Sequence, residues 1–270
     1  PSPLTGSVAI DAEGMDVARA AYFTDQDGVL WRLSMLDPNP SNWLVEPLWD
    51  LFHDESSSPK GYKKGRPSIH PPLLSRDEDG NFVILVGTGD VDNLVEARDS
   101  ADPILHRLVS LTEKRAVSDG ALAGTVEPNW DWPLVDGESV TGPLSLFNGV
   151  VYFGSFVSNG GGVCGFGSSR MWGVHYTEKD TDGGPKAMLQ DGVDPATQEP
   201  HFTRYITQDL EDSLILGVSI ASEPVCVAGT TTNNYSPFTS GYSSNTTVSA
   251  DAKIGGGGFQ IRALVSGKGG

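Results

Sequence analysis

Paired apolar runs, separated by polar turns or loops, recur along this chain. The first pair is AAYFTDQDGVLWRLSM over residues 20–35. Three looser counterparts follow it: FVILVGTGD with ILHRLVSL, GVVYFGSF with SRMWGVHY, and ILGVSIASEPVCVAG with FQIRALVSG. Recurrence of one short unit indicates a repeat architecture. Strand pairs repeated around an axis predict an all-β fold of the β-propeller type.

The turns inside these pairs predict hairpins. Asp27-Gly28 has the composition of a two-residue type I′ turn before the alternating run 29–35, because Gly tolerates the positive φ which that turn requires. Asn148-Gly149 predicts a second hairpin in the same way. Further strands are expected at 20–24, 69–75, 82–87, 103–112, 144–156, 170–176 and 259–265, a strand and turn at 43–52, and loops at 53–67, 130–143, 177–203 and 230–249.

The spacing of the pairs bears on the domain organisation. It is wider than the ~40–45 residues of short propeller repeats, so each unit carries long insertions. The four recognisable units are fewer than most propellers contain, which leaves two alternatives: a small ring, or part of a larger one. The chain opens on Pro1 without an initiator Met, and this favours the second. We therefore expect residues 1–270 to be a single propeller domain or part of one, excised from a longer exported protein.

Composition supports a turn-rich β protein. The chain has 33 Gly and 18 Pro with 20% charged residues, which fits an all-β fold and not a helical bundle. Its 35 acidic residues against 18 Lys and Arg give a net charge of −17. Such a chain has no general attraction for nucleic acid or for anionic lipid. No apolar run is long enough to span a bilayer, so we expect no membrane insertion.

Residue patterns that would support catalysis are weak. Five His occur, and none stands in a Gly-x-Ser-x-Gly frame. His106 and His175 lie in strand-like runs, where packed or solvent-facing positions are expected. Gly87-Thr88-Gly89 follows a strand, but the further glycine and the helix of a dinucleotide site are missing, so a tight bend is the simpler interpretation. We therefore predict a non-catalytic protein.

Four Asp- and Gly-rich stretches have the hard oxygen ligands that Ca²⁺ prefers. They lie at 11–16, 25–28, 77–81 and 180–183, and none matches a full twelve-residue calcium loop. The last three are more simply hairpin turns, because such turns use Asp and Gly. The first does not connect two obvious strands. Its acidic residues are the candidate Ca²⁺ ligands: Asp11, Glu13 and Asp16.

Two loops are candidate binding surfaces, and two cysteines leave an alternative open. The loop 60–66 contains the one basic cluster, and 230–249 is rich in Thr, Asn and Ser. Asn234 and Asn245 begin glycosylation sequons, which is a weak signal. Cys164 and Cys226 can form a disulfide in an exported protein or remain two small buried hydrophobic residues. The basic cluster consists of Lys60, Lys63, Lys64 and Arg66.

The order of the motifs resembles that of a known family. AAYFTDQDGVLWRLSM resembles the blade motif of quinoprotein-like propellers, and RPSIHPPLL, VILVGTGD, GESVTGPLSLFNGVVYFGSF and SRMWGVHY follow it. Over roughly residues 9–180 this succession resembles the C-terminal propeller of the PilY/PilC-type tip-associated proteins of type IV pili. The resemblance implies a quinoprotein-like β-propeller, partial or with degenerate blades and long loop insertions. The chain lacks the family's N-terminal adhesive half.

The resemblance also implies a function and a location. Members are exported, extracellular proteins of the fimbrium, at the pilus tip or cell surface. They support pilus biogenesis, control of retraction, twitching motility and cell adhesion as adhesins, so minor pilins in a tip complex and a host or abiotic surface are the implied partners. Members can carry a calcium loop ahead of a Y-x-x-D-x-x-G-x-L-W-R motif. In this chain Asp11, Glu13 and Asp16 precede that motif, whose positions are Tyr22, Asp25, Gly28, Leu30, Trp31 and Arg32.

Two other classes of function remain as alternatives. A fragment of a quinone-dependent dehydrogenase propeller would share the blade motif, but such enzymes need a complete ring and an adjacent pair of cysteines, which this chain lacks. A generic protein-interaction propeller would have no connection with pili. A bound quinone would indicate the first alternative, and the absence of export would indicate the second.

Overall fold

The computed structural model describes most of the chain. The described residues are 2–12, 17–54, 61–62, 65–91, 105–118, 121–158, 167–193, 197–207, 213–222, 245–254 and 257–267. Within them every regular element is a β-strand except one short 3-10 helix, η1 (Pro40–Asn42). None of these elements is a helix that could cross a membrane. The predicted all-β class is therefore confirmed.

The first half of the chain forms two four-stranded antiparallel sheets. In both sheets the strands lie in chain order, so each strand is hydrogen-bonded to the strands next to it in the sequence. Sheet one contains β1 (Ala9–Asp11), β2 (Ala20–Thr24), β3 (Val29–Ser34) and β4 (Leu44–Asp50). Sheet two contains β7 (Leu73–Arg76), β8 (Phe82–Gly87), β9 (Arg107–Ser118) and β10 (Ala121–Pro133).

The second half forms two further antiparallel sheets, and two small hairpins complete the described strands. Sheet three contains β11 (Glu138–Val140), β12 (Ser145–Phe147), β13 (Val150–Val157), β14 (Ser168–Lys179), β15 (Pro185–Ala187) and β18 (Tyr205–Ile206). Sheet four contains β19 (Ser213–Ser222), β20 (Asn245–Ile254) and β21 (Gly257–Gly267), with β21 in the middle. The hairpins pair β5 (His53–Asp54) with β6 (Gly61–Tyr62), and β16 (Leu189–Val193) with β17 (Pro200–Thr203).

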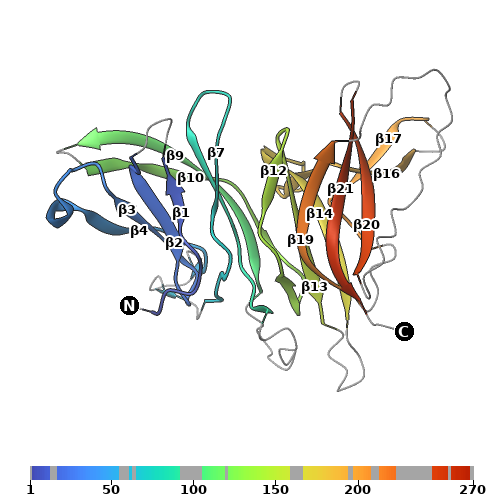
Figure 1. Ribbon diagram of the computed structural model, residues 1–270, viewed down its shortest axis with the longest axis horizontal. Coiled ribbons are helices and arrows are strands. Elements are labelled where there is room, and N and C mark those ends of the chain that lie inside the picture. Colours follow the sequence, from blue (N-terminus) through green and yellow to red (C-terminus); the bar gives the residue numbers. More distant parts are fainter. Residues whose placement is uncertain are drawn as a thin grey trace.

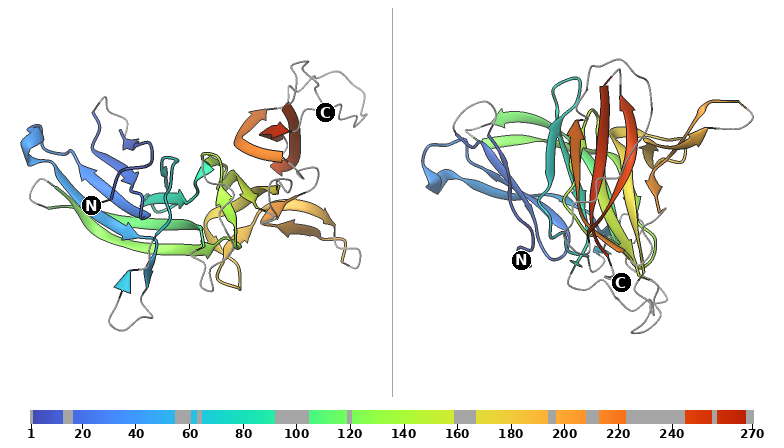
Figure 2. Two further views of the ribbon diagram at one scale, coloured as in Figure 1. Left: turned by 90° about the horizontal axis from the view of Figure 1, so that it is seen from below. Right: turned by 45° about the vertical axis from the view of Figure 1, so that its right-hand side comes forward.

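The four sheets form a row in chain order, each packed face to face with the next. Figures 1 and 2 show them as a curved row that runs from sheet one, near the N-terminus, to sheet four, near the C-terminus. Each apolar pair found in the sequence forms two directly paired strands of one sheet. These pairs are β2 with β3, β8 with β9, β13 with β14, and β19 with β21. The predicted repeat is therefore confirmed as one strand pair in each sheet.

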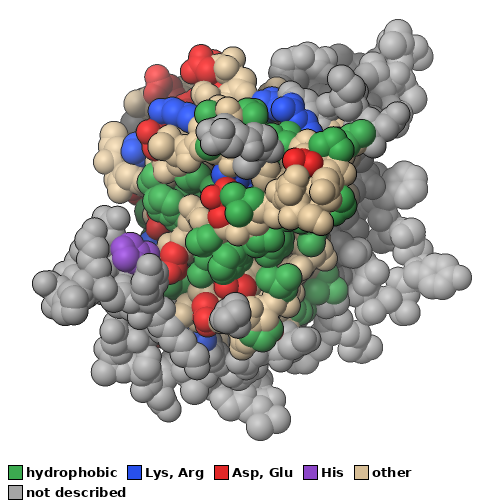
Figure 3. All heavy atoms as spheres, turned by 90° about the vertical axis from the view of Figure 1, so that its left-hand side faces the viewer, with side chains coloured by type: hydrophobic (Ala, Val, Ile, Leu, Met, Phe, Trp, Pro, Cys, Tyr) green, Lys and Arg blue, Asp and Glu red, His purple; other side chains and the backbone are tan. Residues whose placement is uncertain are grey.

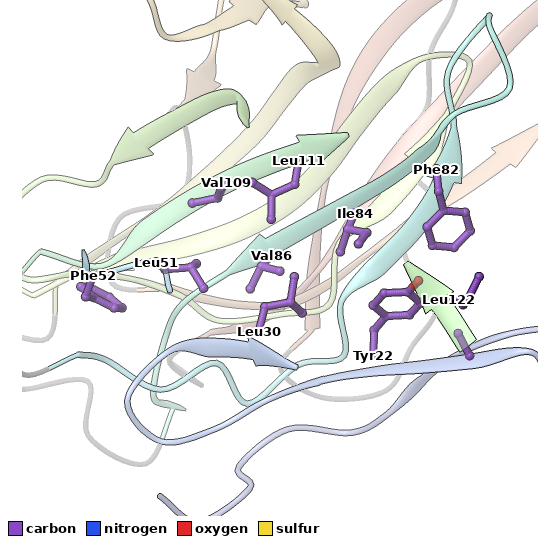
Figure 4. Packing of buried hydrophobic residues seen from close by; sticks show 11 residues of the cluster. Tyr22, Leu30, Leu51, Phe52, Phe82, Ile84, Val86, Val109, Leu111 and Leu122 are labelled. Atoms are coloured by element: carbon purple, nitrogen blue, oxygen red, sulfur yellow. The ribbon is translucent and has the colours of Figure 1, made fainter. Parts of the chain in front are cut away.

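The middle strand β8 shows why its sequence is apolar without alternation. Phe82, Ile84 and Val86 pack into a buried cluster shared with sheet one, whereas Val83 and Leu85 pack into a second cluster shared with sheet three. Successive side chains of a strand point to opposite faces, so a strand that is covered on both faces is apolar throughout. Figure 4 shows the first of these clusters, with side chains from sheets one and two pointing toward each other.

Sheet three repeats this arrangement. Val151 and Phe153 on β13 belong to the cluster shared with sheet two, and Val150 and Tyr152 belong to a third cluster that includes Ile215 of sheet four. Three apolar interfaces therefore join the four sheets face to face. Because successive side chains of a strand point to opposite faces, β8 and β13 each contribute to the interfaces on both sides of their own sheet.

One kind of turn closes three of the hairpins. The stretches 25–28, 77–80 and 180–183 all read Asp-x-Asp-Gly, and in each the carbonyl of the first Asp accepts the N–H of the Gly. The glycines have φ of 78°, 83° and 81°, a region that favours glycine. The interpretation of these three stretches as hairpin turns is therefore confirmed.

The predicted type I′ turn at Asp27-Gly28 is wrong. Within the described residues around this turn only Gly28 has positive φ, and the turn spans four residues from Asp25. The Asp25 carboxylate accepts the backbone N–H groups of Asp27 at 3.0 Å and Val29 at 2.9 Å, which fixes the longer turn. At Asn148-Gly149 both residues have positive φ, 48° and 77°, so the type I′ prediction is confirmed there.

Several predicted loops contain strands. Residues 130–133 end β10, where a register shift between Pro128 and Trp130 hides the alternation from sequence inspection. The polar region 177–203 includes the end of β14 and also β15, β16 and β17. The end of the predicted loop 230–249 lies in β20, while 230–244 lies outside the described residues.

His106 is packed inside the protein just before β9. It is 7% exposed, and its Nδ1 lies 3.1 Å from Thr88 Oγ1. The same Thr88 oxygen accepts the backbone N–H of Arg107 at 2.8 Å. Burial, together with the nearby charge of Arg66, lowers the pKa of His106 to about 4. The folded protein therefore holds this imidazole neutral.

This burial predicts a loss of stability in acid. The unfolded chain protonates His106 near its usual pKa of 6.5, so stability is fully present above that pH and is lost as pH falls toward about 4. We expect His106 to contribute about 3 kcal/mol to this loss. Denaturant unfolding of His106→Gln at pH 7.5 and pH 4.5 should show a smaller difference than the parent protein. The exposed His201→Gln is the control, and equal pH dependence of the parent and His106→Gln would refute the expectation.

Candidate functional site

The candidate calcium loop lies at the beginning of sheet one. β1 pairs with β2, and the backbone N–H of Arg19 donates to the carbonyl of Asp11 at 2.8 Å, so the loop closes a hairpin. The expectation that this loop does not connect two strands is therefore wrong. β1 has only three residues, too few for a visible alternation. Glu13 and Asp16 lie outside the described residues.

Asp11 itself has a partner from sheet two. Its Oδ2 forms an ion pair with the guanidinium of Arg115 on β9, and the Asp11 residue is 7% exposed. In this arrangement the carboxylate serves as a counter-ion for Arg115, so a cation at Asp11 would have to compete with that guanidinium. Asp11 is therefore not a free carboxylate that Ca²⁺ could bind without displacing Arg115. Among the residues with described side chains, no group of three His, Cys, Asp or Glu is placed to hold a metal ion.

A groove lies beside Asp11, between the edge strands of two sheets. β1 is the edge of sheet one and β7 is the edge of sheet two, and the two strands are neighbours in space. The groove is open and has a volume of about 270 Å³. Its lining is mixed, with aliphatic, aromatic, acidic and basic side chains: Ile10, Asp11, Ala12, Leu74, Ser75, Arg76 and Phe82.

Beneath the groove a buried network of charges joins sheets one and two. Glu113 on β9 is fully buried and forms ion pairs with Arg32 on β3 and with Arg115. Tyr22 on β2 donates its hydroxyl to Glu113 at 2.7 Å. Arg32 also contacts Glu46 on β4 and donates to the carbonyl oxygen of Leu122 at 2.9 Å. Every charged group here has a partner, as buried charges require.

Two aromatic rings complete this network. The guanidinium of Arg115 lies 3.4 Å from the centroid of the Phe82 ring, and the Tyr22 and Phe82 rings stack with centroids 5.5 Å apart. Burial, followed by the negative charge of Glu113, raises the pKa of the Tyr22 phenol above its usual value. Tyr22 is therefore a hydrogen-bond donor at every physiological pH. It holds Glu113 in place and does not serve as a base.

The predicted blade motif thus has a structural role at each polar position. Asp25 fixes the turn and accepts the indole N–H of Trp31 at 2.9 Å. Gly28 lies where an added Cβ would come within 3 Å of the Phe52 ring and of the Arg66 carbonyl. Tyr22 and Arg32 reach Glu113 across the interface between the sheets. The motif therefore fixes the turn within one blade and forms polar contacts to the next blade.

A second buried carboxylate occupies sheet three. Glu138 on β11 accepts from the Ser155 hydroxyl at 2.6 Å and pairs with Arg170 at 2.8 Å. Burial raises the pKa of Glu138, although Ser155 and Arg170 favour its ionised form. The indole N–H of Trp172 donates to the same Ser155 oxygen at 2.8 Å. Like Glu113, this group is enclosed by its partners.

Sequence reasoning missed both buried glutamates. Glu113 follows Val109 and Leu111 at intervals of two, so it stands on an apolar row of β9. Glu113 stands in an apolar row of one strand and Arg32 in an apolar row of another, and from this signal their ion pair could have been predicted. Glu138 carried no comparable signal, because β11 has only three residues.

The other predicted sites are only partly described. Arg66 is described and half-buried, whereas Lys60, Lys63 and Lys64 lie outside the described residues. Cys164 and Cys226 also lie outside them, so their pairing stays a prediction. Asn234 lies outside the described residues, and Asn245 begins β20.

The pairing of Asp11 with Arg115 predicts a loss of stability that does not depend on calcium. We expect Asp11→Asn to lower the free energy of unfolding by about 1.5–3 kcal/mol, because it weakens a hydrogen bond between charged groups that are largely shielded from solvent. Denaturant unfolding should show this loss equally with excess chelator and with excess Ca²⁺. Glu127→Gln is the control, since it breaks the exposed pair with Lys114 and should change little. A loss that appears only with Ca²⁺ would instead make Asp11 a metal ligand.

The sheets and their interfaces define the class of protein. Antiparallel sheets that stack face to face in chain order, each built around a paired apolar repeat, are the blades of a β-propeller. No family model and no curated protein matches the sequence. The structure is similar to the crystal structure of the Pseudomonas aeruginosa PilY1 C-terminal domain, with a TM-score of 0.51 and 14% sequence identity.

This similarity covers 80% of the chain and 56% of the solved PilY1 domain, so the chain spans little more than half the length of that domain. The solved domain is a β-propeller. The predicted resemblance to the C-terminal propeller of the PilY/PilC-type proteins is therefore confirmed at the level of the fold. In this chain the row of sheets continues beyond residue 180, where the recognisable motifs ended, through sheet four.

Proposed function

We propose that this chain is a non-catalytic module of an exported type IV pilus protein, located at the pilus tip or cell surface. The observation that carries the proposal is the structural similarity to the PilY1 C-terminal domain over 80% of the chain. The order of sequence motifs points to the same family. Partners are then the other proteins of the tip complex, minor pilins among them, and a host or abiotic surface.

The buried polar groups support a role in binding and not in catalysis. Glu113 and Glu138, the most buried carboxylates among the described residues, are each paired with an Arg and a hydroxyl group. The buried His106 is held neutral against Thr88. These groups stabilise the blades, and a catalytic group would instead face a cleft that admits substrate.

The loops are the proposed working surface. A propeller supports its loops on a rigid set of sheets, and binding residues are commonly carried on loops of this kind. The basic loop 60–66 is the first candidate, because it gathers cations in a chain of net charge −17. It would contact an acidic partner or surface. We assign the candidate calcium loop at 11–16 no more than a regulatory role, because Ca²⁺ there would compete with Arg115 for Asp11.

Loss of the gene and substitution of one loop test the proposal. In the bacterium that encodes the chain, we expect deletion of the gene to reduce surface pili, twitching and adhesion. A wild-type copy should restore all three. A copy with Lys60, Lys63 and Lys64 changed to Gln should be exported and folded normally, yet restore adhesion at least threefold less well.

The matched control is Lys114→Gln with Lys179→Gln and Lys186→Gln, which removes the same number of cations from strands. This control should behave like the wild type. Normal piliation, twitching and adhesion in the deletion strain would refute the pilus assignment. Absorbance of a bound quinone in the purified protein would support the dehydrogenase alternative instead.

A further inference from the structure

The groove between β1 and β7 runs along an open edge of sheet two. Among the described strands, β7 is hydrogen-bonded only to β8. Where this hairpin closes, the backbone N–H of Asp77 donates to the carbonyl of Asn81 at 3.0 Å. Bonded and non-bonded pairs alternate along an antiparallel ladder, so Ser75 bonds to β8, whereas Leu74 and Arg76 turn their backbone groups to the open side. An edge of this kind can accept a further strand.

The size and lining of the groove suit one side chain of an extended segment. Leu74 and Phe82 both line it, and both pack on the face of sheet two that meets sheet one. They provide an apolar contact beside the open backbone edge. The volume of about 270 Å³ lies below the ~300–1,000 Å³ of pockets that enclose a small molecule, and the groove is open to solvent. A peptide that lies across the groove needs no enclosure.

The charges around the groove favour a basic occupant. On the β1 side, Asp11 is already paired with Arg115. On the β7 side, Arg76 donates to a carbonyl of its own hairpin turn at 2.8 Å. The same turn carries Glu78 and Asp79, which are exposed and have no ion pair within the described part of the chain. In Figure 1 this turn reaches the upper rim of the molecule, where Figure 3 shows Asp and Glu side chains.

We propose that β7 accepts an extended, basic segment of a partner protein as an added strand. One apolar side chain of that segment lies in the groove, and its Lys or Arg side chains lie beside Glu78 and Asp79. Main-chain hydrogen bonds then supply affinity, and the alternate side chains supply specificity. A second copy is disfavoured as the occupant, because two chains of net charge −17 repel one another. This surface is independent of the pilus assignment, because it follows from β7 and its turn alone.

Calorimetric titration of the full polypeptide with the peptide acetyl-Val-Thr-Val-Thr-Lys-Lys-amide tests the proposal. We expect saturable binding that weakens as salt is added, because the carboxylates of the turn are exposed. Replacing both Lys of the peptide with Glu should weaken binding by about tenfold or more. Methylation of alternate amide nitrogens separates strand addition from simple charge attraction. Methyl groups on one alternate set should abolish binding, and on the other set should change it by less than about threefold, because only one set faces β7.

Ala12→Trp locates the site on the protein. Ala12 is exposed and lines the groove, so the larger side chain should occlude it and weaken peptide binding by about tenfold or more. Ala116→Trp is the matched control, since Ala116 is exposed on β9 and does not line the groove.

Four results would overturn the proposal. They are the absence of saturable binding, equal binding of the Lys and Glu peptides, equal loss with both methylated sets, and undiminished binding to Ala12→Trp. Light scattering covers the remaining occupant. Self-association of the polypeptide that Ala12→Trp abolishes would also overturn the proposal, because a second copy would then occupy the groove.

Discussion

Replacing Glu113 with Ala is expected to lower the free energy of unfolding by about 3–5 kcal/mol, because it leaves charges buried without a partner. Glu113 is the common partner of Arg32 and Arg115, and Tyr22 donates to it as well. Removing the carboxylate leaves the 2% exposed Arg32 with only the half-exposed Glu46 as counter-ion. Unfolding in urea, followed by tryptophan fluorescence, measures the loss.

Two further variants separate a buried charge from a simple cavity. Arg32→Met combined with Glu113→Leu should recover a large part of the lost stability, because an apolar replacement of both partners removes the desolvation cost. Glu127→Ala, on the neighbouring strand β10 and exposed, should have little effect. A loss below about 1 kcal/mol for Glu113→Ala would show that the network contributes little to holding the sheets together.

Phe153→Ala is expected to cost about 3–5 kcal/mol, the range for truncating a fully buried aromatic residue. Phe153 lies on β13 at the interface between sheets two and three, and its ring stacks on Trp172 with centroids 5.4 Å apart and an angle of 12°. Little nearby structure can move into the space, because strands are hydrogen-bonded on both sides of it. Thermal and urea unfolding should both report the change.

Phe202→Ala is the matched control for this truncation. The ring of Phe202 is half-exposed on β17, so its loss should change stability by less than about 0.5 kcal/mol. Equal effects at the two positions would contradict the assignment of Phe153 to an interface between blades. The comparison tests the packing of the sheets directly, since both variants remove the same atoms.

The hydrophobic periodicity of the sequence was sufficient to predict the fold class, but it did not predict which side chains are in contact. Apolar pairs located two directly paired strands in each of the four main sheets, and Asn148-Gly149 located a turn to the residue. Short strands such as β1 and β11 have too few residues to show a period. β10 shifts its register at a bulge, which places Trp130 and Trp132 out of phase with the preceding residues.

The candidate site was less predictable for a different reason. Asp11 was selected for its spacing from other acidic residues, but its partner Arg115 comes from a strand 104 residues away. No local pattern reports such a distance. The same holds for Arg32 and Glu113, which the sequence placed in separate repeats. Composition identified which residues could bear charge, and only the stacking of the sheets decided which charges meet.

The long reach of this ion pair has a consequence for the order in which the protein folds. Arg32 and Glu113 are separated by 81 residues, so sheet one is synthesised well before its buried counter-ion emerges. During that interval Arg32 has only Glu46 as counter-ion, and Tyr22 and Leu30 lack the sheet that buries them. Contacts of such high sequence separation form slowly, and exposed apolar strands aggregate. We therefore expect the nascent N-terminal region to require a chaperone that holds it open until β9 is available.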